Sequence, residues 1–146
     1  MRLECASSGS LVFTRPDEAR EFAEATGVDI LAPAVGNMHG LLATMVHGDA
    51  RKHLDIERIA QIKAGTGMPL TLHGGSGTDD DDFLRAIEAG MTTVHISTEL
   101  RLAWRRGLEA ALAAEPENLV PYQLFRKAGE AMQEVVTKRL KLFNRL

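Results

Sequence analysis

Short apolar runs alternate with amphipathic segments along the chain. The apolar runs span residues 29–35, 68–73 and 92–97, and the last is rich in β-branched side chains. Such short continuous runs are typical of strands that are covered on both faces, as in parallel sheets. We therefore predict three strands, with Pro33 and Pro69 each removing one backbone donor from the first two.

Helical patterns with recognisable ends lie between the runs. Thr14 and Asp17 resemble a capping box at the start of the first helix, and Gly27 is expected to end it. Asp55 is expected to cap a second helix that Gly65 closes. Both helices carry apolar side chains at three- and four-residue spacing, which predicts one buried face on each.

A third helix is expected to open with the acidic residues 79–82, because negative charge is favourable at the N-terminal end of a helix dipole. The apolar spacing predicts that this helix buries Phe83, Leu84 and Ile87. Gly90 follows the last apolar position and is expected to end the helix.

Two further helices complete the pattern: one follows Thr98, and a long one spans 122–146. Alternating strands and helices predict an α/β fold with a parallel sheet. Either an open doubly wound sheet or part of a (β/α)8 TIM barrel would fit. A whole barrel takes about 250 residues, so 146 residues are too few to close one. We expect one partial domain over 1–146, with a strand or loop over 1–13.

Composition and charge argue against several classes of protein. Apolar residues make up 45% and charged residues 25% of the chain, as in ordinary globular domains. The net charge of −3 argues against binding to nucleic acid or to membrane surfaces. Cys5 is the single cysteine, which excludes an internal disulfide and a cysteine zinc cluster. No apolar run suits a membrane span or a secretory signal, so a cytoplasmic location is expected.

The residues that follow the predicted strands are chemically unusual. His39 lies in the segment after the first strand, and His73 ends the second. Function gathers at the carboxyl ends of parallel strands, where two imidazoles can meet on one metal ion. The alternative is that both histidines are core or loop residues whose ring nitrogens bond backbone carbonyls.

Small residues over 74–77 follow His73 and form a second candidate site. Such a turn lets backbone N–H groups converge on an anion, with the Ser76 hydroxyl as a further donor. The alternative is a tight loop that needs positive φ angles. Ser97 and Thr98 follow the third strand and could add hydroxyl donors, although Thr98 could equally be a helix cap.

Three segments in this order, over 36–40, 72–77 and 95–100, resemble the signatures of class II, zinc-dependent ketose-bisphosphate aldolases. This family includes the fructose- and tagatose-bisphosphate enzymes. The flanking segments 14–19 and 128–132 also resemble the family, and the resemblance covers nearly the whole chain after about residue 10.

The resemblance implies roles for individual residues. His39 and His73 match two of the three zinc ligands. Backbone oxygens of Met38, Gly40 and Gly74 match those that bind a monovalent cation, Na⁺ or K⁺, in some members. The positions that match the binding site for the substrate and its phosphate are Gly40, Gly74, Gly75, Ser76, His95, Ser97 and Thr98. The family usually has asparagine at the position of His95, which leaves this residue as a substrate contact, a new metal ligand or a core residue.

The implied reaction is zinc-dependent, reversible aldol cleavage of a ketose 1,6-bisphosphate to dihydroxyacetone phosphate and an aldehyde phosphate, as in glycolysis. The catalytic aspartate and first zinc histidine of the family are an adjacent Asp-His pair, which this chain lacks. We therefore expect the C-terminal half of the barrel, about strands five to eight, that pairs with an N-terminal half or with itself. The alternatives are a non-catalytic remnant or phosphate-binding module, and an unrelated open α/β sheet.

Overall fold

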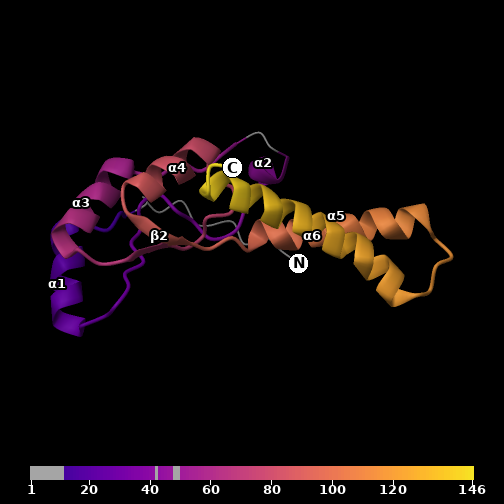
Figure 1. The fold of residues 1–146 in the computed structure, drawn as a ribbon, viewed down its shortest axis with the longest axis horizontal. Helices are drawn as coiled ribbons and strands as arrows, with labels where there is room; N and C mark the ends of the chain where they lie inside the picture. Colours follow the sequence, from indigo (N-terminus) through magenta and orange to yellow (C-terminus); the bar gives the residue numbers. More distant parts are fainter. Residues whose placement is uncertain (1–11, 42, 48–49) are drawn as a thin grey trace. The chain divides into compact units, whose positions relative to one another are not determined.

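The computed structural model describes residues 12–41, 43–47 and 50–146 (Figure 1). Cys5 and residues 1–11 of the strand or loop expected over 1–13 lie outside these residues, and residues 12–13 belong to no helix or strand. The described chain forms two compact units, one through His95 and the other over Ile96–Leu146. None of the described helices combines the length and apolar character that a membrane crossing requires. The helices and strands are α1 (Pro16–Thr26), α2 (Ala43–His47), α3 (Ile56–Thr66), β1 (Leu70–Leu72), α4 (Asp80–Glu88), β2 (Met91–Val94), α5 (Thr98–Ala114) and α6 (Pro121–Phe143).

The strands β1 and β2 pair in parallel, with Leu72 opposite Val94, which confirms the predicted α/β fold with parallel pairing. All three residues of β1 are buried, as the continuous apolar run predicts. β2 is shorter than the predicted run over 92–97 and is only partly buried. In the first unit, α4 packs against β2, and α3 packs against both α4 and α1.

The prediction of a strand over 29–35 is wrong. The segment runs beside β1 in the parallel direction but forms a single bridge, between Leu31 and Leu70. Leu31 donates its N–H to Pro69 O and accepts from Thr71 N, at 3.1 and 2.9 Å. Pro33 has no N–H with which to continue the ladder, so the extended segment does not become a regular strand.

The predicted start of the first helix is displaced by one residue. Arg15, not Thr14, is the N-cap of α1, and its backbone N–H donates to the Glu18 carboxylate at 3.2 Å. Thr14 instead exchanges two hydrogen bonds with Ala34, each 2.8 Å long. The Thr14 hydroxyl, which the local pattern predicted as a helix cap, thus bonds a residue that is distant in sequence. Gly27 ends the helix in the left-handed conformation, as predicted.

Asp55 caps α3 as predicted, by accepting the backbone N–H of Arg58 at 3.0 Å. The predicted end at Gly65 is wrong, because α3 continues to Thr66. The left-handed residue that ends it is Gly67, with φ of 67°. Gly65 lies inside the last turn, and glycine is tolerated there at a cost of about 1 kcal/mol relative to alanine.

α4 begins within the acidic run, with Asp79 as the N-cap. Its buried residues are Asp82, Phe83 and Ala86. The prediction that Leu84 and Ile87 are buried is wrong, since both are only half-buried. Compared with the predicted buried face, the observed one is shifted around the helix toward Asp82. The carboxylate of Asp82 is buried and accepts the backbone N–H of Leu54 at 2.9 Å.

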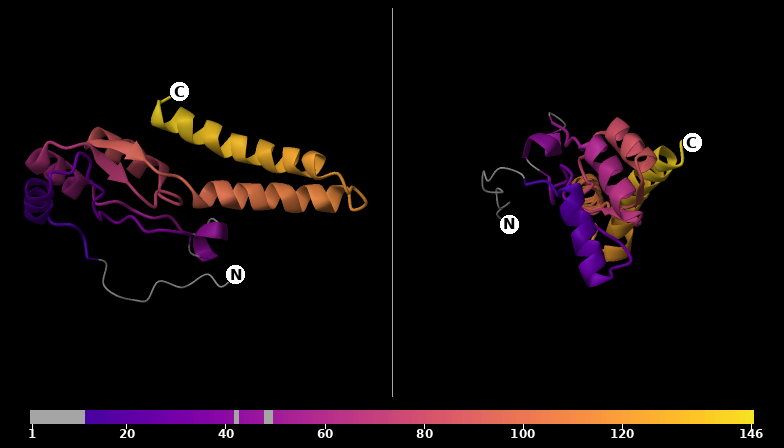
Figure 2. Two further views of the ribbon diagram at one scale, coloured as in Figure 1. Left: turned by 90° about the horizontal axis from the view of Figure 1, so that it is seen from below. Right: turned by 90° about the vertical axis from the view of Figure 1, so that its left-hand side faces the viewer.

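The second unit is an antiparallel helical hairpin of α5 and α6, which lie side by side in Figure 2. A Cβ added to Gly107 of α5 would lie 2.9 Å from the Cα of Ala128 in α6, so the two backbones approach closely. Arg139 of α6, which is buried, holds Glu99 of α5 through two hydrogen bonds of 2.8 and 2.9 Å. Thr98 is the first residue of α5, and the cap position belongs to Ser97.

Candidate functional site

Three histidines of the first unit gather at one end of the parallel segments. His73 follows β1, His95 follows β2, and His39 follows the segment that bridges to β1. The rings of His39 and His73 have centres 5.9 Å apart. The rings of His73 and His95 meet edge to face at 4.5 Å, with their Nδ1 atoms 3.4 Å apart. The parallel direction of the segments explains the cluster, because it brings their carboxyl ends to one edge.

The exposure of these rings bears on what they can bind. His39 and His95 are exposed and His73 is half-buried, so His95 is not a core residue. Zinc usually takes three or four protein ligands. His39 and His73 can supply two, and no group of three or more His, Cys, Asp or Glu side chains within the described ranges is arranged to hold a metal ion. The pair fits part of a zinc site rather than a whole one.

Asn37 holds the loop of His39 against the end of β1. Its side-chain oxygen accepts the N–H of Val35 at 2.8 Å, and its side-chain nitrogen donates to the carbonyl of His73 at 2.9 Å. Gly74 allows the same approach, because a Cβ there would lie 2.6 Å from the carbonyl oxygen of Met38. The sequence reasoning did not single out Asn37, and its position two residues before His39, in the segment between Gly36 and Gly40, was the available signal.

A buried lysine lies beneath this loop pair. Lys52 is 4% exposed, and its Nζ donates to the backbone carbonyls of two loops at 2.5–3.2 Å. The acceptors are Met38, Gly40, Gly74 and Ser76. The sequence reasoning missed Lys52, since nothing in its polar neighbourhood distinguishes it from a solvated lysine.

The glycine loop has the predicted positive φ angles at Gly74 and Gly77. Its backbone groups are partly occupied, because Gly75 donates its N–H to the carbonyl of His95 at 3.1 Å. Ser76 is buried at 3% exposure. Among the described residues, the buried Thr78 hydroxyl has no hydrogen-bond partner. An anion that binds this loop must therefore either displace the hydrogen bond between Gly75 and His95 or use other donors of the loop.

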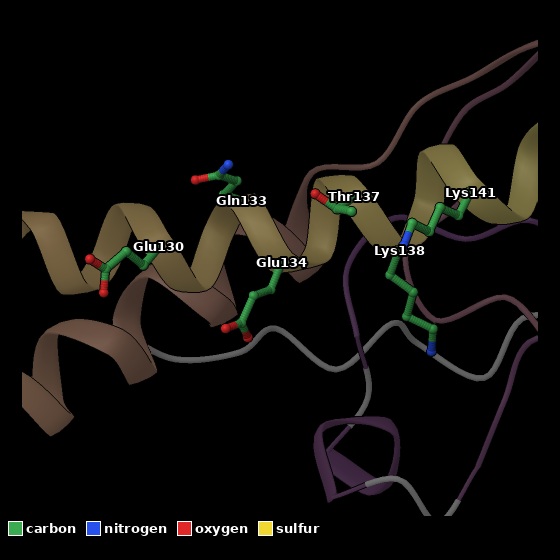
Figure 3. A pocket seen from close by; sticks show the side chains of 6 residues that line it. All are labelled: Glu130, Gln133, Glu134, Thr137, Lys138 and Lys141. Carbon is green, nitrogen blue, oxygen red and sulfur yellow. The ribbon is translucent and has the colours of Figure 1, made fainter. Parts of the chain in front are cut away.

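Ser97 and Thr98 lie in the second unit, at the start of α5. That unit also carries a hollow along α6, shown in Figure 3. Its lining side chains are Glu130, Gln133, Glu134, Thr137, Lys138 and Lys141. No residue predicted for the site lines this hollow, and its two glutamates precede its two lysines along the exposed face of one helix.

Comparisons with known proteins identify the family of the chain. The family model for fructose-bisphosphate aldolase class-II matches residues 3–145. The YdjI aldolase from Escherichia coli K12 is 33% identical, with a TM-score of 0.71 over 90% of this chain and 46% of that one. A structure described as a putative fructose-1,6-biphosphate aldolase from Coccidioides immitis is 30% identical, with a TM-score of 0.70 over 91% of this chain and 44% of that one.

A third structure, fructose-bisphosphate aldolase from Campylobacter jejuni, shares the fold at 18% identity, with a TM-score of 0.72 over 90% of this chain and 45% of that one. The chain thus spans about half the length of each of these structures. A family match over nearly every residue, together with 33% identity across nine-tenths of the chain, is decisive. The chain belongs to the class-II fructose-bisphosphate aldolase family.

Proposed function

We propose that the chain contributes the zinc-binding and phosphate-binding side of an aldolase. The reaction would be reversible aldol cleavage of a ketose 1,6-bisphosphate to dihydroxyacetone phosphate and an aldehyde phosphate. The observation that carries the proposal is the pairing of the His39 and His73 rings directly beside the glycine loop. This is the arrangement that would place a metal next to a bound phosphate ester.

The proposed architecture is the C-terminal half of a (β/α)8 TIM barrel, about strands five to eight. The parallel pair β1 and β2 and the parallel bridge at Leu31 support it. The chain matches about half of each related structure, and its described residues supply two imidazoles of a larger ligand set. We therefore propose that the acid/base aspartate and the remaining zinc ligands come from a complementing N-terminal half, or that copies of the chain associate.

His39 and His73 would hold the zinc ion. When bound, zinc supplies a Lewis acid that polarises the substrate carbonyl. Asn37 fixes the loop of His39 to the end of β1, and the His95 ring abuts Nδ1 of His73. A hydrogen bond at Nδ1 orients an imidazole ligand and fixes its tautomer. These contacts would hold both rings in place before substrate arrives.

The phosphate end of the substrate would lie at the glycine loop. The proposed contacts are Gly40, Gly74, Gly75, Ser76, His95, Ser97 and Thr98. Positive φ angles at Gly40 and Gly74 and the close approach of the two loops support a cradle of backbone groups. Binding energy from a remote phosphate would position the reacting carbons. A cytoplasmic enzyme of carbohydrate metabolism is the setting that fits this substrate.

A non-catalytic phosphate-binding module is the second candidate. It is favoured by the incomplete set of zinc ligands among the described residues. Such a module would bind dihydroxyacetone phosphate but would not cleave a ketose bisphosphate with any partner.

Zinc binding and turnover test the proposal together. The chain alone is expected to bind zinc weakly and to cleave no ketose bisphosphate. Addition of the N-terminal half of a family member is expected to tighten zinc binding and to restore cleavage. Calorimetric zinc titration and a coupled assay for dihydroxyacetone phosphate measure the two effects.

Variants of the histidines sharpen this test. His39→Ala and His73→Ala should each abolish zinc binding. His53→Ala is the matched control, because His53 is also exposed but its ring bonds Asp82 at 3.0 Å. Zinc binding that survives both cluster variants would contradict the metal site. Zinc binding without cleavage under complementation would favour the non-catalytic module.

A further inference from the structure

We propose that the ammonium group of Lys52 serves as an internal monovalent cation, which holds the two site loops together without Na⁺ or K⁺. Lys52 is a positioning residue in this proposal. It acts on His39 and His73 through the backbone that carries them, and it touches neither substrate nor metal. The proposal rests on contacts of the free chain, so it stands whether or not the chain takes part in aldol cleavage.

The acceptors around the ammonium come from both histidine loops. Met38 and Gly40 flank His39, and their carbonyls lie 2.5 and 2.7 Å from Lys52 Nζ. Gly74 and Ser76 follow His73, and their carbonyls lie at 3.2 and 2.7 Å. One charge therefore ties together the two segments that present the candidate zinc ligands.

The number of oxygens distinguishes this site from an ordinary hydrogen bond. An ammonium group carries three N–H donors, yet four carbonyl oxygens surround Nζ. Carbonyl dipoles that converge on one point create a negative potential that a bare positive charge relieves. A coordinated alkali cation would satisfy the same shell. Three of these four carbonyls are those that the family resemblance assigns to such a cation.

Burial shows that the contact is built into the fold. Lysine is almost never buried unless its charge has partners, and Lys52 is 4% exposed. Its backbone is fixed by a parallel bridge to Thr78, with its N–H donating to Gly77 and its carbonyl accepting from Asp79. The stem runs past Gly77, where a Cβ would lie 3.8 Å from Lys52 Cε. The backbone hydrogen bonds of Lys52 and the path of its side chain therefore hold the ammonium group at one fixed position.

Salt exchange on a truncated variant tests the proposal. Lys52→Ala removes the charge and leaves space for an ion. In tetramethylammonium chloride we expect its melting temperature to fall by several degrees below that of the original chain. At equal ionic strength, KCl or NH4Cl should restore at least half of the loss. The original chain should melt at the same temperature in all three salts.

Two variants serve as controls. Lys52→Met fills the space without a charge, so it should be destabilised and insensitive to the choice of cation. Lys63→Ala removes another lysine that bonds two backbone carbonyls, those of Gly67 and Met68 at 3.3 and 2.8 Å, at the end of α3. It should show no cation-specific recovery, because its carbonyls do not enclose a site.

The salt-exchange experiment can contradict the proposal in two ways. A Lys52→Ala melting temperature that ignores the cation, or an original chain that responds to K⁺ as strongly as the variant, would overturn the proposal. If Lys52→Ala folds in no salt, timed acetylation of the original chain decides. Lys52 should then react many-fold more slowly than the exposed Lys127, and equal rates would refute the internal-cation role.

Discussion

The tertiary contacts of His95 leave two roles for this residue, which are orientation of His73 and contact with the substrate. Its side chain is exposed and its Nδ1 lies 3.4 Å from Nδ1 of His73. Through this contact the His95 ring can orient the ring of His73. His95 also remains a proposed substrate contact. The two roles differ in what a substitution changes.

We predict that His95→Ala weakens zinc binding by about 10–100-fold, as the loss of a hydrogen bond to a ligating imidazole typically does. Competition titration against a chelator measures the change. His95→Asn, which restores the family's usual residue and a hydrogen-bonding group, should recover part of the affinity. Unchanged zinc affinity, together with an increased KM for the ketose bisphosphate once an N-terminal half is added, would instead assign His95 to the substrate.

Asp55 makes the stability of α3 depend on pH. The backbone N–H of Arg58, followed by its guanidinium, holds the pKa of Asp55 below its ordinary value of 3.8. The unfolded chain therefore takes up the proton first as the pH falls. The stabilisation is fully present above pH 3.8 and is lost as the pH drops through the lower folded value.

The expected outcome is that Asp55→Asn flattens the acid dependence of unfolding while keeping the cap. Asp55→Ala should lose about 0.5–2 kcal/mol at neutral pH, because asparagine caps a helix nearly as well as aspartate and alanine does not. Urea unfolding at neutral and at acid pH measures both effects. An acid dependence that stays the same in Asp55→Asn would show that other carboxylates cause it.

At the scale of helices, Gly107 and Gly129 offer a matched pair in the hairpin of α5 and α6. A Cβ on Gly107 would lie 2.9 Å from both the Cα of Ala128 and the carbonyl oxygen of Lys127, whereas a Cβ on Gly129 would meet nothing within 4 Å. The same substitution should therefore have opposite effects at the two sites.

We expect Gly107→Ala to destabilise the chain by about 1–3 kcal/mol through overpacking. Gly129→Ala should stabilise it by about 0.5–1 kcal/mol, because alanine favours the helix. Thermal unfolding of the two variants gives the comparison. Stabilisation by both would mean that α5 and α6 do not pack at Gly107 in solution.

Helix ends were more predictable than strands. Asp55, Asp79 and Gly27 act through their own neighbours in sequence, so local chemistry was sufficient to place them. Thr14 failed as a cap because its hydroxyl bonds Ala34, twenty residues away. The segment over 29–35 failed as a strand because its ladder to β1 needs donors that Pro33 cannot provide.

At the scale of the whole molecule, the chain forms two compact units and spans about half the length of its structural relatives. The three histidines lie in the first unit, whereas Ser97 and Thr98 begin the second. Within the part of the chain that the structure describes, the proposed zinc site has two imidazoles and no complete ligand set, which is why complementation is the central experiment.

The sequence by itself determined the α/β class, the parallel pairing, the family and the histidine pair, because these depend on apolar runs, glycines and motif order along the chain. Only the tertiary structure revealed three features of the site. These are the burial of Lys52 beneath the loops, the hydrogen bond from Asn37 to the carbonyl of His73, and the contact of His95 with His73. These contacts join residues from 12 to 36 positions apart. Such contacts leave no local periodicity, since they are made only when separate parallel segments bring their ends to one edge.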